Sequence, residues 1–294
     1  MAVRLVVLRA LGLGDLLTAV PALRALARAF PAHERVLLAP AALAPVVDLL
    51  DDASYALRDV DGVRALPPAL PPIARGADVA VNLHGRGPQS TALLRASRPR
   101  ALVAFGEQAD WRDGEHETVR WCRLLEAAGI AADPADLDLA PPAEPSPHAG
   151  ATVIHPGASA PARRWPAVRW AAVARQLRGP VVVTAGPGEQ ALARAVARDA
   201  GATVFAGDLR ALAALVASAA RVLCADTGVA HLATALGTPS VVLFGPTPPA
   251  CWGPPPERPR HRVLWAGRSG DPNGERPDPG LLTLHPHDVL EAIA

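Results

Sequence analysis

Short apolar runs alternate with longer amphipathic stretches along the first half of the chain. Four of the apolar runs have the length and composition of buried parallel strands, at residues 3–8, 35–38, 78–83 and 100–105. Stretches such as 16–29 and 116–128 carry apolar residues at helical spacing. Because strands that alternate with helices form parallel sheets, this pattern predicts a doubly wound α/β domain of the Rossmann-like type.

The same alternation resumes after a proline-rich stretch at residues 141–147, which is typical of a linker. Strands are expected at 151–154, 181–184, 203–205, 221–225 and 239–245, and helices at 166–177, 189–200, 209–219 and 286–293. We therefore expect two Rossmann-like domains, at residues 1–145 and 150–285, and a terminal helix in 286–294. The carboxyl ends of both sheets would face an interdomain cleft.

Composition narrows the range of functions. Half of the 294 residues are hydrophobic. The formal net charge is +1, so no strong electrostatic field favours binding to nucleic acid or to an acidic membrane. The chain contains arginine but no lysine, which rules out Schiff-base chemistry. Its three cysteines are widely spaced and predict neither a disulfide framework nor a metal site. With no signal peptide and no membrane-length apolar run, the protein is expected in the cytoplasm.

The stretch from residue 221 to residue 254 carries the clearest candidate chemistry. Its apolar run is followed by Asp226, Thr227 and Gly228, which end a strand and open a helix. The free N–H groups and positive dipole end of such a helix suit a phosphate or diphosphate. His231 projects on the side of the first turn. Taken singly, these residues could also be only a helix cap and a half-exposed histidine.

A second candidate follows the first strand, where Gly12, Gly14 and Asp15 form a glycine-containing turn before a helix. The spacing lacks the third glycine of the dinucleotide fingerprint, so it is a weak NAD motif. Asp15 could be a general base or only a helix cap. His84 and Arg86 follow another strand, and they could reach an acceptor or remain solvated.

Several segments, taken in order, resemble the signature of glycosyltransferase family 9, the heptosyltransferase family. In the second half they are Asp226-Thr227-Gly228, His231-Leu232, Gly237-Thr238-Pro239, Phe244-Gly245-Pro246-Thr247 and Trp252-Gly253-Pro254. Near the amino terminus they are Gly14-Asp15 and Val20-Pro21-Ala22-Leu23. The chain departs from the pattern at Arg163, where family members usually have lysine, and at Cys251, where they often have arginine.

The resemblance implies a protein of GT-B architecture, an inverting glycosyltransferase that moves a heptose from ADP-heptose to an acceptor hydroxyl. We expect no cofactor beside this nucleotide-sugar co-substrate. The acceptor would be a glycan, a lipid-linked molecule or a natural product. Asp15 would be the general base. Apart from the resemblance, Gly14, His84 and Arg86 are candidates for the acceptor side because of their place after strands. The donor-binding set comprises Arg163, Glu189, Asp226, Thr227, Gly228 and His231. The helix in 286–294 would cross back to the first domain. We expect a monomer, at most peripheral to the inner face of the membrane.

The donor residues have separate expected roles. Arg163 would neutralise the diphosphate, and the backbone of Thr227 and Gly228 would bond its oxygens. Asp226 would accept bonds from sugar hydroxyls, because its charge would repel a phosphate. Glu189 matches a family acid that holds the nucleoside part of the donor.

Three rival functions stay open at this point: a nucleotide-sugar epimerase of similar architecture, a non-catalytic nucleotide-sugar binding protein and an NAD-dependent oxidoreductase. A metal-bridged donor would require an acidic pair. Asp59 with Asp61, and Asp136 with Asp138, have a suitable spacing but lie away from the donor stretch. We therefore expect a reaction without a metal.

Overall fold

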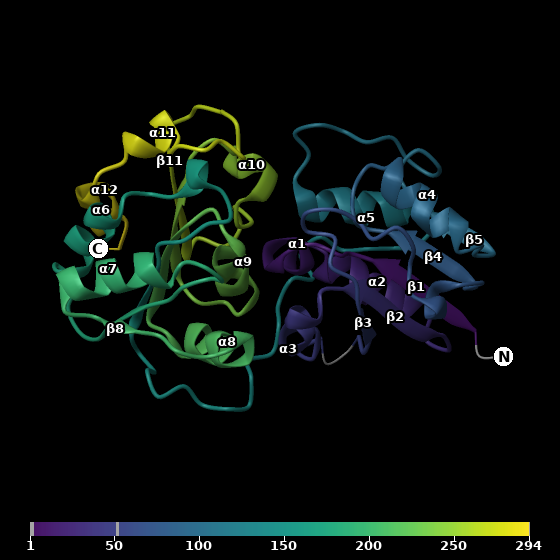
Figure 1. Ribbon diagram of the computed structural model, residues 1–294, viewed down its shortest axis with the longest axis horizontal. Helices are drawn as coiled ribbons and strands as arrows, with labels where there is room; N and C mark the ends of the chain where they lie inside the picture. The colour runs from purple at the N-terminus through teal and green to yellow at the C-terminus, as the bar shows by residue number, and fades with distance from the viewer. Residues whose placement is uncertain (1–2, 51–52, 294) are drawn as a thin grey trace. The chain divides into compact units, whose positions relative to one another are not determined.

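The chain folds into two compact units in the computed structural model, which describes residues 3–50 and 53–293. The units are Met1–Ala140 and Pro141–Ala294, and each contains a parallel sheet with helices around it (Figure 1). The proline-rich stretch expected to be a linker forms no helix or strand and begins the second unit. The two parallel α/β domains predicted from the sequence are confirmed.

The sheet of the first unit has five strands in the order β3-β2-β1-β4-β5. They are β1 (Arg4–Leu8), β2 (Glu34–Ala39), β3 (Ala56–Asp59), β4 (Val79–Asn82) and β5 (Ala101–Val103). The chain adds β2 and β3 on one side of β1 and then crosses over to add β4 and β5 on the other. The gap between β1 and β4 is therefore the topological switch point. The sequence did not predict β3, an edge strand with two exposed residues, because it lacks a continuous apolar run.

The helices in the described part of the first unit are α1 (Leu13–Thr18), α2 (Val20–Ala29), α3 (Ala44–Val47), α4 (Gln89–Ala96) and α5 (Glu117–Ala127). The single helix predicted at 16–29 is wrong, because the chain breaks at Ala19 between α1 and α2. Pro21 explains the break, since proline has no N–H to donate and its ring crowds the preceding turn. α2 packs against α5, and Val6 of β1 lies in a core cluster with Leu94 of α4.

The sheet of the second unit has six strands in the order β11-β10-β9-β6-β7-β8. They are β6 (Thr152–His155), β7 (Val181–Val183), β8 (Thr203–Val204), β9 (Arg221–Ala225), β10 (Ser240–Phe244) and β11 (His261–Trp265). Here the direction of winding reverses between β6 and β9, which places the switch point there. The sequence did not predict β11, an edge strand whose short run mixes histidine and arginine with apolar residues.

The helices in the described part of this unit are α6 (Ala167–Ala174), α7 (Gln190–Ala200), α8 (Leu209–Ser218), α9 (Gly228–Ala235), α10 (Pro249–Trp252), α11 (Pro279–Leu282) and α12 (Pro286–Ile293). In Figure 1, α6, α7 and α12 lie on one face of the sheet, and α8 and α9 lie on the other. A core cluster joins Trp170 of α6, Val196 of α7 and Val289 of α12 to Leu223 of β9. α12 packs on α6, β10 and β11. Its expected return to the first domain stays a prediction.

Candidate active site

A first cluster of polar side chains lies at the switch point of the first sheet, beside the carboxyl ends of β1 and β4. Ligands of doubly wound sheets bind in this crevice, because the loops on its two sides lead to opposite faces of the sheet. Arg9 follows β1 directly, and His84 comes two residues after β4. Gly14 and Asp15 lie in the first turn of α1. Residues from three separate elements thus contribute polar groups to this part of the first unit.

Asp15, the predicted base, lies on a turn that its neighbours hold in place. Gly12 occupies the N-cap of α1, so Asp15 lies at the third position inside the helix rather than at its N-cap. The Asp15 side chain is 30% exposed and lies where the helix dipole favours a negative charge. Its backbone oxygen accepts hydrogen bonds from Arg9 Nε at 2.9 Å and from Thr18 Oγ1 at 3.0 Å. The carboxylate is therefore accessible while its main chain is fixed.

Arg9 is a functional candidate that sequence reasoning missed. Its side chain is only 1% exposed, and its Nη2 lies 3.6 Å from Asp15 Oδ1 and 3.4 Å from Glu117 Oε1. The guanidinium also lies over the ring of Trp121, 4.7 Å from its centroid. Two carboxylates beside a buried cation offset part of the cost of taking its charge out of water. The signal available in the sequence was a charged residue placed directly after four buried apolar residues of β1.

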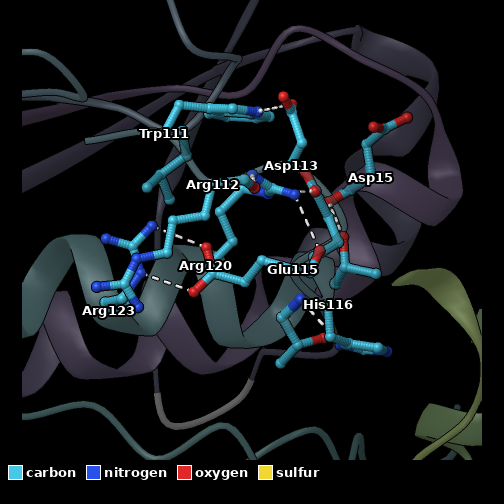
Figure 2. A network of polar contacts seen from close by, with 12 residues as sticks. Asp15, Trp111, Arg112, Asp113, Glu115, His116, Arg120 and Arg123 are labelled. Atoms are coloured by element: carbon cyan, nitrogen blue, oxygen red, sulfur yellow. Dashed lines mark hydrogen bonds and ion pairs between the residues drawn. The ribbon is translucent and has the colours of Figure 1, made fainter. Parts of the chain in front are cut away.

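Glu117, the first residue of α5, extends this cluster toward the loop before that helix. Figure 2 draws residues of this loop, among them Trp111, Asp113 and Glu115, together with Asp15. Glu117 Oε2 accepts a hydrogen bond from Arg120 Nε at 3.0 Å. Arg120 in turn donates to the backbone oxygens of Arg112 at 2.7 Å and of Glu115 at 2.9 Å. A continuous chain of alternating charges thus leads from Asp15 through the two buried arginines to this loop.

His84 lies at the edge of the same cluster. Burial and the positive charge of Arg9 lower the pKa of its imidazole, and the negative charge of Asp15 acts in the opposite direction. Its Nδ1 is buried and has no hydrogen-bond partner among the described residues. Its backbone N–H donates to Asn82 Oδ1 at 3.0 Å, while Arg86 is exposed further along the loop. The structure brings His84 together with Asp15 and leaves Arg86 at the surface.

A second polar cluster lies at the switch point of the other sheet, beside the carboxyl ends of β6 and β9. Asp226 follows β9 and is only 4% exposed, and its Oδ2 lies 3.7 Å from Arg163 Nη1. Thr227 is the N-cap of α9, but its side chain makes no capping hydrogen bond. Gly228 is the first residue of this helix. A cation beside the start of a helix suits an anionic ligand, since both favour negative charge.

Glu189 occupies the N-cap of α7 in the same unit. Its Oε2 accepts a hydrogen bond from the Gly186 N–H at 2.9 Å and lies 3.8 Å from His155 Nε2. Its Oε1 lies 3.7 Å from Arg164 Nη2. A Cβ on Gly157 would fall 1.8 Å from Oε2, so the carboxylate fills space that only a glycine leaves free. Glu189 therefore holds a nearly buried negative charge in a defined position.

His155 is a second residue that sequence reasoning did not assign to the site. It ends β6, and burial lowers the pKa of its imidazole to about 4, so the ring is neutral at pH 7. Its Nδ1 lies 2.9 Å from Thr184 Oγ1, which leaves Nε2 facing Glu189. The available signal was a histidine at the end of an otherwise apolar strand. Its neutral ring can orient the Glu189 carboxylate without adding a charge.

The predicted donor residue His231 lies on α9, with its ring 5.9 Å from the ring of Trp252 in an edge-to-face contact. Cys251 lies beside Trp252 on α10 and is half-buried. The contact ties the histidine to the loop and short helix that follow β10. His231 and Cys251 therefore belong to the same side of the second unit.

The acidic pairs considered for a metal have other partners. Asp59 and Asp61 accept backbone N–H groups, and Asp136 forms an ion pair with Arg24 at 3.0 Å. Within residues 3–50 and 53–293 no group of three or more His, Cys, Asp or Glu side chains has the arrangement of a metal site. Over the same described ranges, no helix has the length and apolar character needed to cross a membrane.

Two doubly wound parallel sheets, each with a polar cluster at its switch point, are the architecture expected of the GT-B class of proteins. The model of glycosyltransferase family 9 (heptosyltransferase) matches residues 90–280, which is most of the chain. The chain therefore belongs to glycosyltransferase family 9, and the family expected from the sequence motifs is confirmed. A comparison with curated proteins gives no match.

Solved structures of several family members share the fold. ADP-heptose lipopolysaccharide heptosyltransferase II of E. coli is similar with a TM-score of 0.76 at 19% identity, over 99% of this chain and 97% of that one. A family 9 glycosyltransferase of Veillonella parvula gives 0.75 at 20% identity, over 98% and 95%. The E. coli heptosyltransferase WaaC with ADP gives 0.72 at 18% identity, over 99% and 98%. These similarities confirm the predicted fold class.

Proposed function

We propose that the protein transfers a heptose from ADP-heptose to a hydroxyl group of a glycan, lipid-linked or natural-product acceptor, with inversion at the anomeric carbon. The observation that carries the proposal is the accessible Asp15 carboxylate at the switch point of the first unit, in a chain of this family. The choice of donor is supported by the relatives, since WaaC has been solved with ADP and with ADP-2-deoxy-2-fluoro heptose.

The second unit supplies groups that suit an ADP-sugar. Arg163 neutralises the diphosphate, and the backbone N–H groups of Thr227 and Gly228 bond its oxygens at the start of α9. Asp226 accepts hydrogen bonds from hydroxyls of the sugar, because its own charge would repel a phosphate. Glu189, fixed by its neighbours, accepts bonds from hydroxyls of the nucleoside. The diphosphate, the sugar hydroxyls and the nucleoside hydroxyls thus each have a partner of suitable chemistry.

The reaction needs one proton transfer and one displacement. Asp15 takes the proton of the acceptor hydroxyl while the oxygen of that hydroxyl attacks the anomeric carbon. The bond from the anomeric carbon to the diphosphate breaks, and ADP leaves with the bonding electron pair. A single displacement inverts the configuration at this carbon. Gly14, His84 and Arg86 contact the acceptor in this scheme.

Positive charge on the protein replaces a metal in the proposed reaction. Arg163 and the amino-terminal end of α9 stabilise the charge that develops on the leaving ADP. Arginine remains protonated over the whole physiological pH range, so this stabilisation is always present. We expect a monomer that works in the cytoplasm, at the inner membrane face if its acceptor is lipid-linked.

A panel of nucleotide sugars tests the donor assignment. A ligand present at about 100 times its dissociation constant stabilises the folded state by about 2.7 kcal/mol, which raises the melting temperature by several degrees. ADP-heptose should give the largest shift, and UDP-sugars and NAD little. ADP release that depends on an added acceptor identifies a transferase, whereas an epimerase converts the donor alone and a binding protein converts nothing. Stabilisation by UDP-sugars or NAD alone contradicts the proposal.

A further inference from the structure

We propose that Arg9 is a positioning residue for the transfer reaction, which fixes the first turn of α1 and aims the carboxylate of Asp15. The inference rests on the proposed role of Asp15 as the general base. Arg9 is almost wholly buried and contacts the catalytic machinery through Asp15, so its effect on the substrate is indirect.

Two contacts join the guanidinium of Arg9 to Asp15. Nε donates to the backbone oxygen at 2.9 Å, and Nη2 lies 3.6 Å from Oδ1. In a regular helix the backbone oxygen of Asp15 would accept a hydrogen bond from the N–H of Ala19, four residues further along the chain. Here the Ala19 N–H donates to the backbone oxygen of Leu16 instead. Arg9 and the Thr18 hydroxyl satisfy the Asp15 oxygen in place of that N–H. The break between α1 and α2 thus creates an acceptor that Arg9 fills.

The shape of the arginine head group matters for this arrangement. A guanidinium is a planar fork with several N–H donors in fixed directions, whereas the lysine ammonium is a point charge on a flexible stem. Arg9 uses Nε for the Asp15 backbone and Nη2 for Thr18 Oγ1 at 3.2 Å. Only a side chain with such a fork can hold both the main chain and the side chain of the same turn.

Arg9 is anchored on its other side by elements outside α1. It donates through Nη1 to the backbone oxygen of Leu83, just after β4, and its Nη2 lies 3.4 Å from Glu117 Oε1 of α5. Glu117 is buried and is held in turn by Arg120 Nε at 3.0 Å. The turn that carries Asp15 is therefore tied to β4 and α5 through one side chain.

This linkage has a consequence for the rate of transfer. A general base must lie within hydrogen-bond reach of the proton that it removes. A displacement of about 1 Å can lower a catalytic rate by about 100-fold. Loss of the Arg9 contacts would free the turn without removing the base. Donor affinity should not change, because the proposed donor groups belong to the second unit.

Three variants separate positioning from a purely structural role. Arg9→Met removes the polar contacts and keeps the length of the side chain, and Arg9→Lys keeps the charge but loses the fork. Arg24→Met is the matched control, since Arg24 is a buried arginine of the same unit, 9% exposed, that pairs with Asp136 at 3.0 Å. The measurements are hydrogen exchange of the amides of residues 16–18, ADP release from ADP-heptose and ADP affinity by calorimetry.

In Arg9→Met the amides of residues 16–18 should exchange at least about 10-fold faster than in the parent, because the anchor of the turn is gone. Turnover should fall by about 10- to 100-fold, and ADP affinity should stay unchanged. Arg9→Lys should recover part of the turnover. Arg24→Met should lower the melting temperature but leave the exchange of residues 16–18 and the turnover at parent values.

Parent-like exchange in α1, or parent-like turnover per folded molecule, in Arg9→Met would overturn the proposal. If that variant does not fold, Arg9→Lys decides, and parent values in both measurements overturn the proposal there. A failure of the proposed function gives a different result. If Asp15→Asn keeps its turnover, the base assignment is wrong, yet exchange in Arg9→Met still reports whether Arg9 holds the turn.

Discussion

The carboxylate of Glu189 lies against the backbone of Gly157, so close that a Cβ on that glycine would fall 1.8 Å from Oε2. No pair of non-bonded atoms tolerates this distance, so a side chain at position 157 must displace Glu189. The Gly186 N–H and the His155 ring contact the same carboxylate. The fixed position of the acid therefore depends on the absence of a side chain one strand away.

Gly157→Ala should lower the affinity for ADP by about 10-fold, or about 1.4 kcal/mol, because it moves the acid that we assign to the nucleoside. In a Glu189→Ala background the same change should cost little more, since the clash is gone. Calorimetry on the parent, both single variants and the double variant measures this coupling. Gly85→Ala is the control, because a Cβ there meets nothing within 4 Å. Additive losses in the double variant would show that the two residues act separately.

Mild acid should destabilise the protein through His155. Its folded pKa of about 4 lies below the ordinary value of 6.5, so between these values the unfolded chain binds a proton that the folded chain does not. The contribution of this histidine to stability is complete above pH 6.5 and is lost as the pH falls toward 4. At pH 5 the loss should be about 2 kcal/mol of unfolding free energy.

Urea unfolding at pH 7 and pH 5 measures this loss. His155→Gln should remove most of it, because glutamine does not titrate. His285→Gln changes an exposed histidine of the same unit and should retain the parent's pH dependence. An equal acid loss in the parent and in His155→Gln would show that other groups cause it.

The central strands and most helices were predictable from sequence because burial on both faces leaves continuous apolar runs. β3 and β11 were not, since an edge strand buries fewer residues and its polar positions hide the pattern. The break at Ala19 was also missed, although Pro21 marks it. The local sequence pattern therefore predicted the central strands of each sheet more reliably than the edge strands.

The candidate site divides in the same way. Asp15, Glu189 and Asp226 follow strands in recognisable motifs, so the sequence alone could nominate them. Arg9 could not be assigned, because its partner Glu117 is 108 residues away along the chain. His155 depends similarly on burial and on a partner, Thr184, that directly follows another strand. A residue whose role depends on contacts with distant parts of the chain cannot be identified from the residues next to it in the sequence.

Asp226→Ala and His231→Ala should each weaken ADP-heptose binding by about 10-fold while the protein stays folded. Asp226 is buried beside Arg163, and His231 lies on the helix that starts at the proposed phosphate site. Calorimetry with ADP-heptose and with ADP separates sugar contacts from nucleotide contacts. Asp226→Ala should lose affinity for the sugar nucleotide more than for ADP. Unchanged affinity in both variants would remove the donor assignment.

Turnover should continue in excess EDTA, because Arg163 and the start of α9 supply the positive charge that the leaving ADP requires. Arg163→Met should then lower turnover in the same buffer by about 100-fold, as expected when one such charge is removed. The measurement is ADP release before and after chelation. Loss of activity that magnesium or manganese restores would show that the reaction needs a metal.

Asp15→Asn separates the roles of Asp15 most directly. Asparagine keeps the size of the side chain but cannot take a proton at neutral pH. The melting temperature should fall by no more than a few degrees, because Gly12 rather than Asp15 occupies the N-cap and Glu117 still pairs with the buried Arg9. ADP affinity should also stay the same, since the proposed donor groups belong to the second unit. Turnover should fall by about 10²- to 10⁴-fold, which is the usual contribution of general base catalysis.

The control is Asp59→Asn, which changes an exposed carboxylate of the same unit that accepts the Ala41 N–H. This variant should keep the parent's turnover, so a shared loss would indicate a general effect of removing charge. If Asp15 is the base, adding a strong external nucleophile such as azide should partly restore ADP release in Asp15→Asn, since azide needs no proton removed. A rate within a few-fold of the parent in Asp15→Asn, without azide, would refute the mechanism, because the oxygen nucleophile would then have lost its proton to another group.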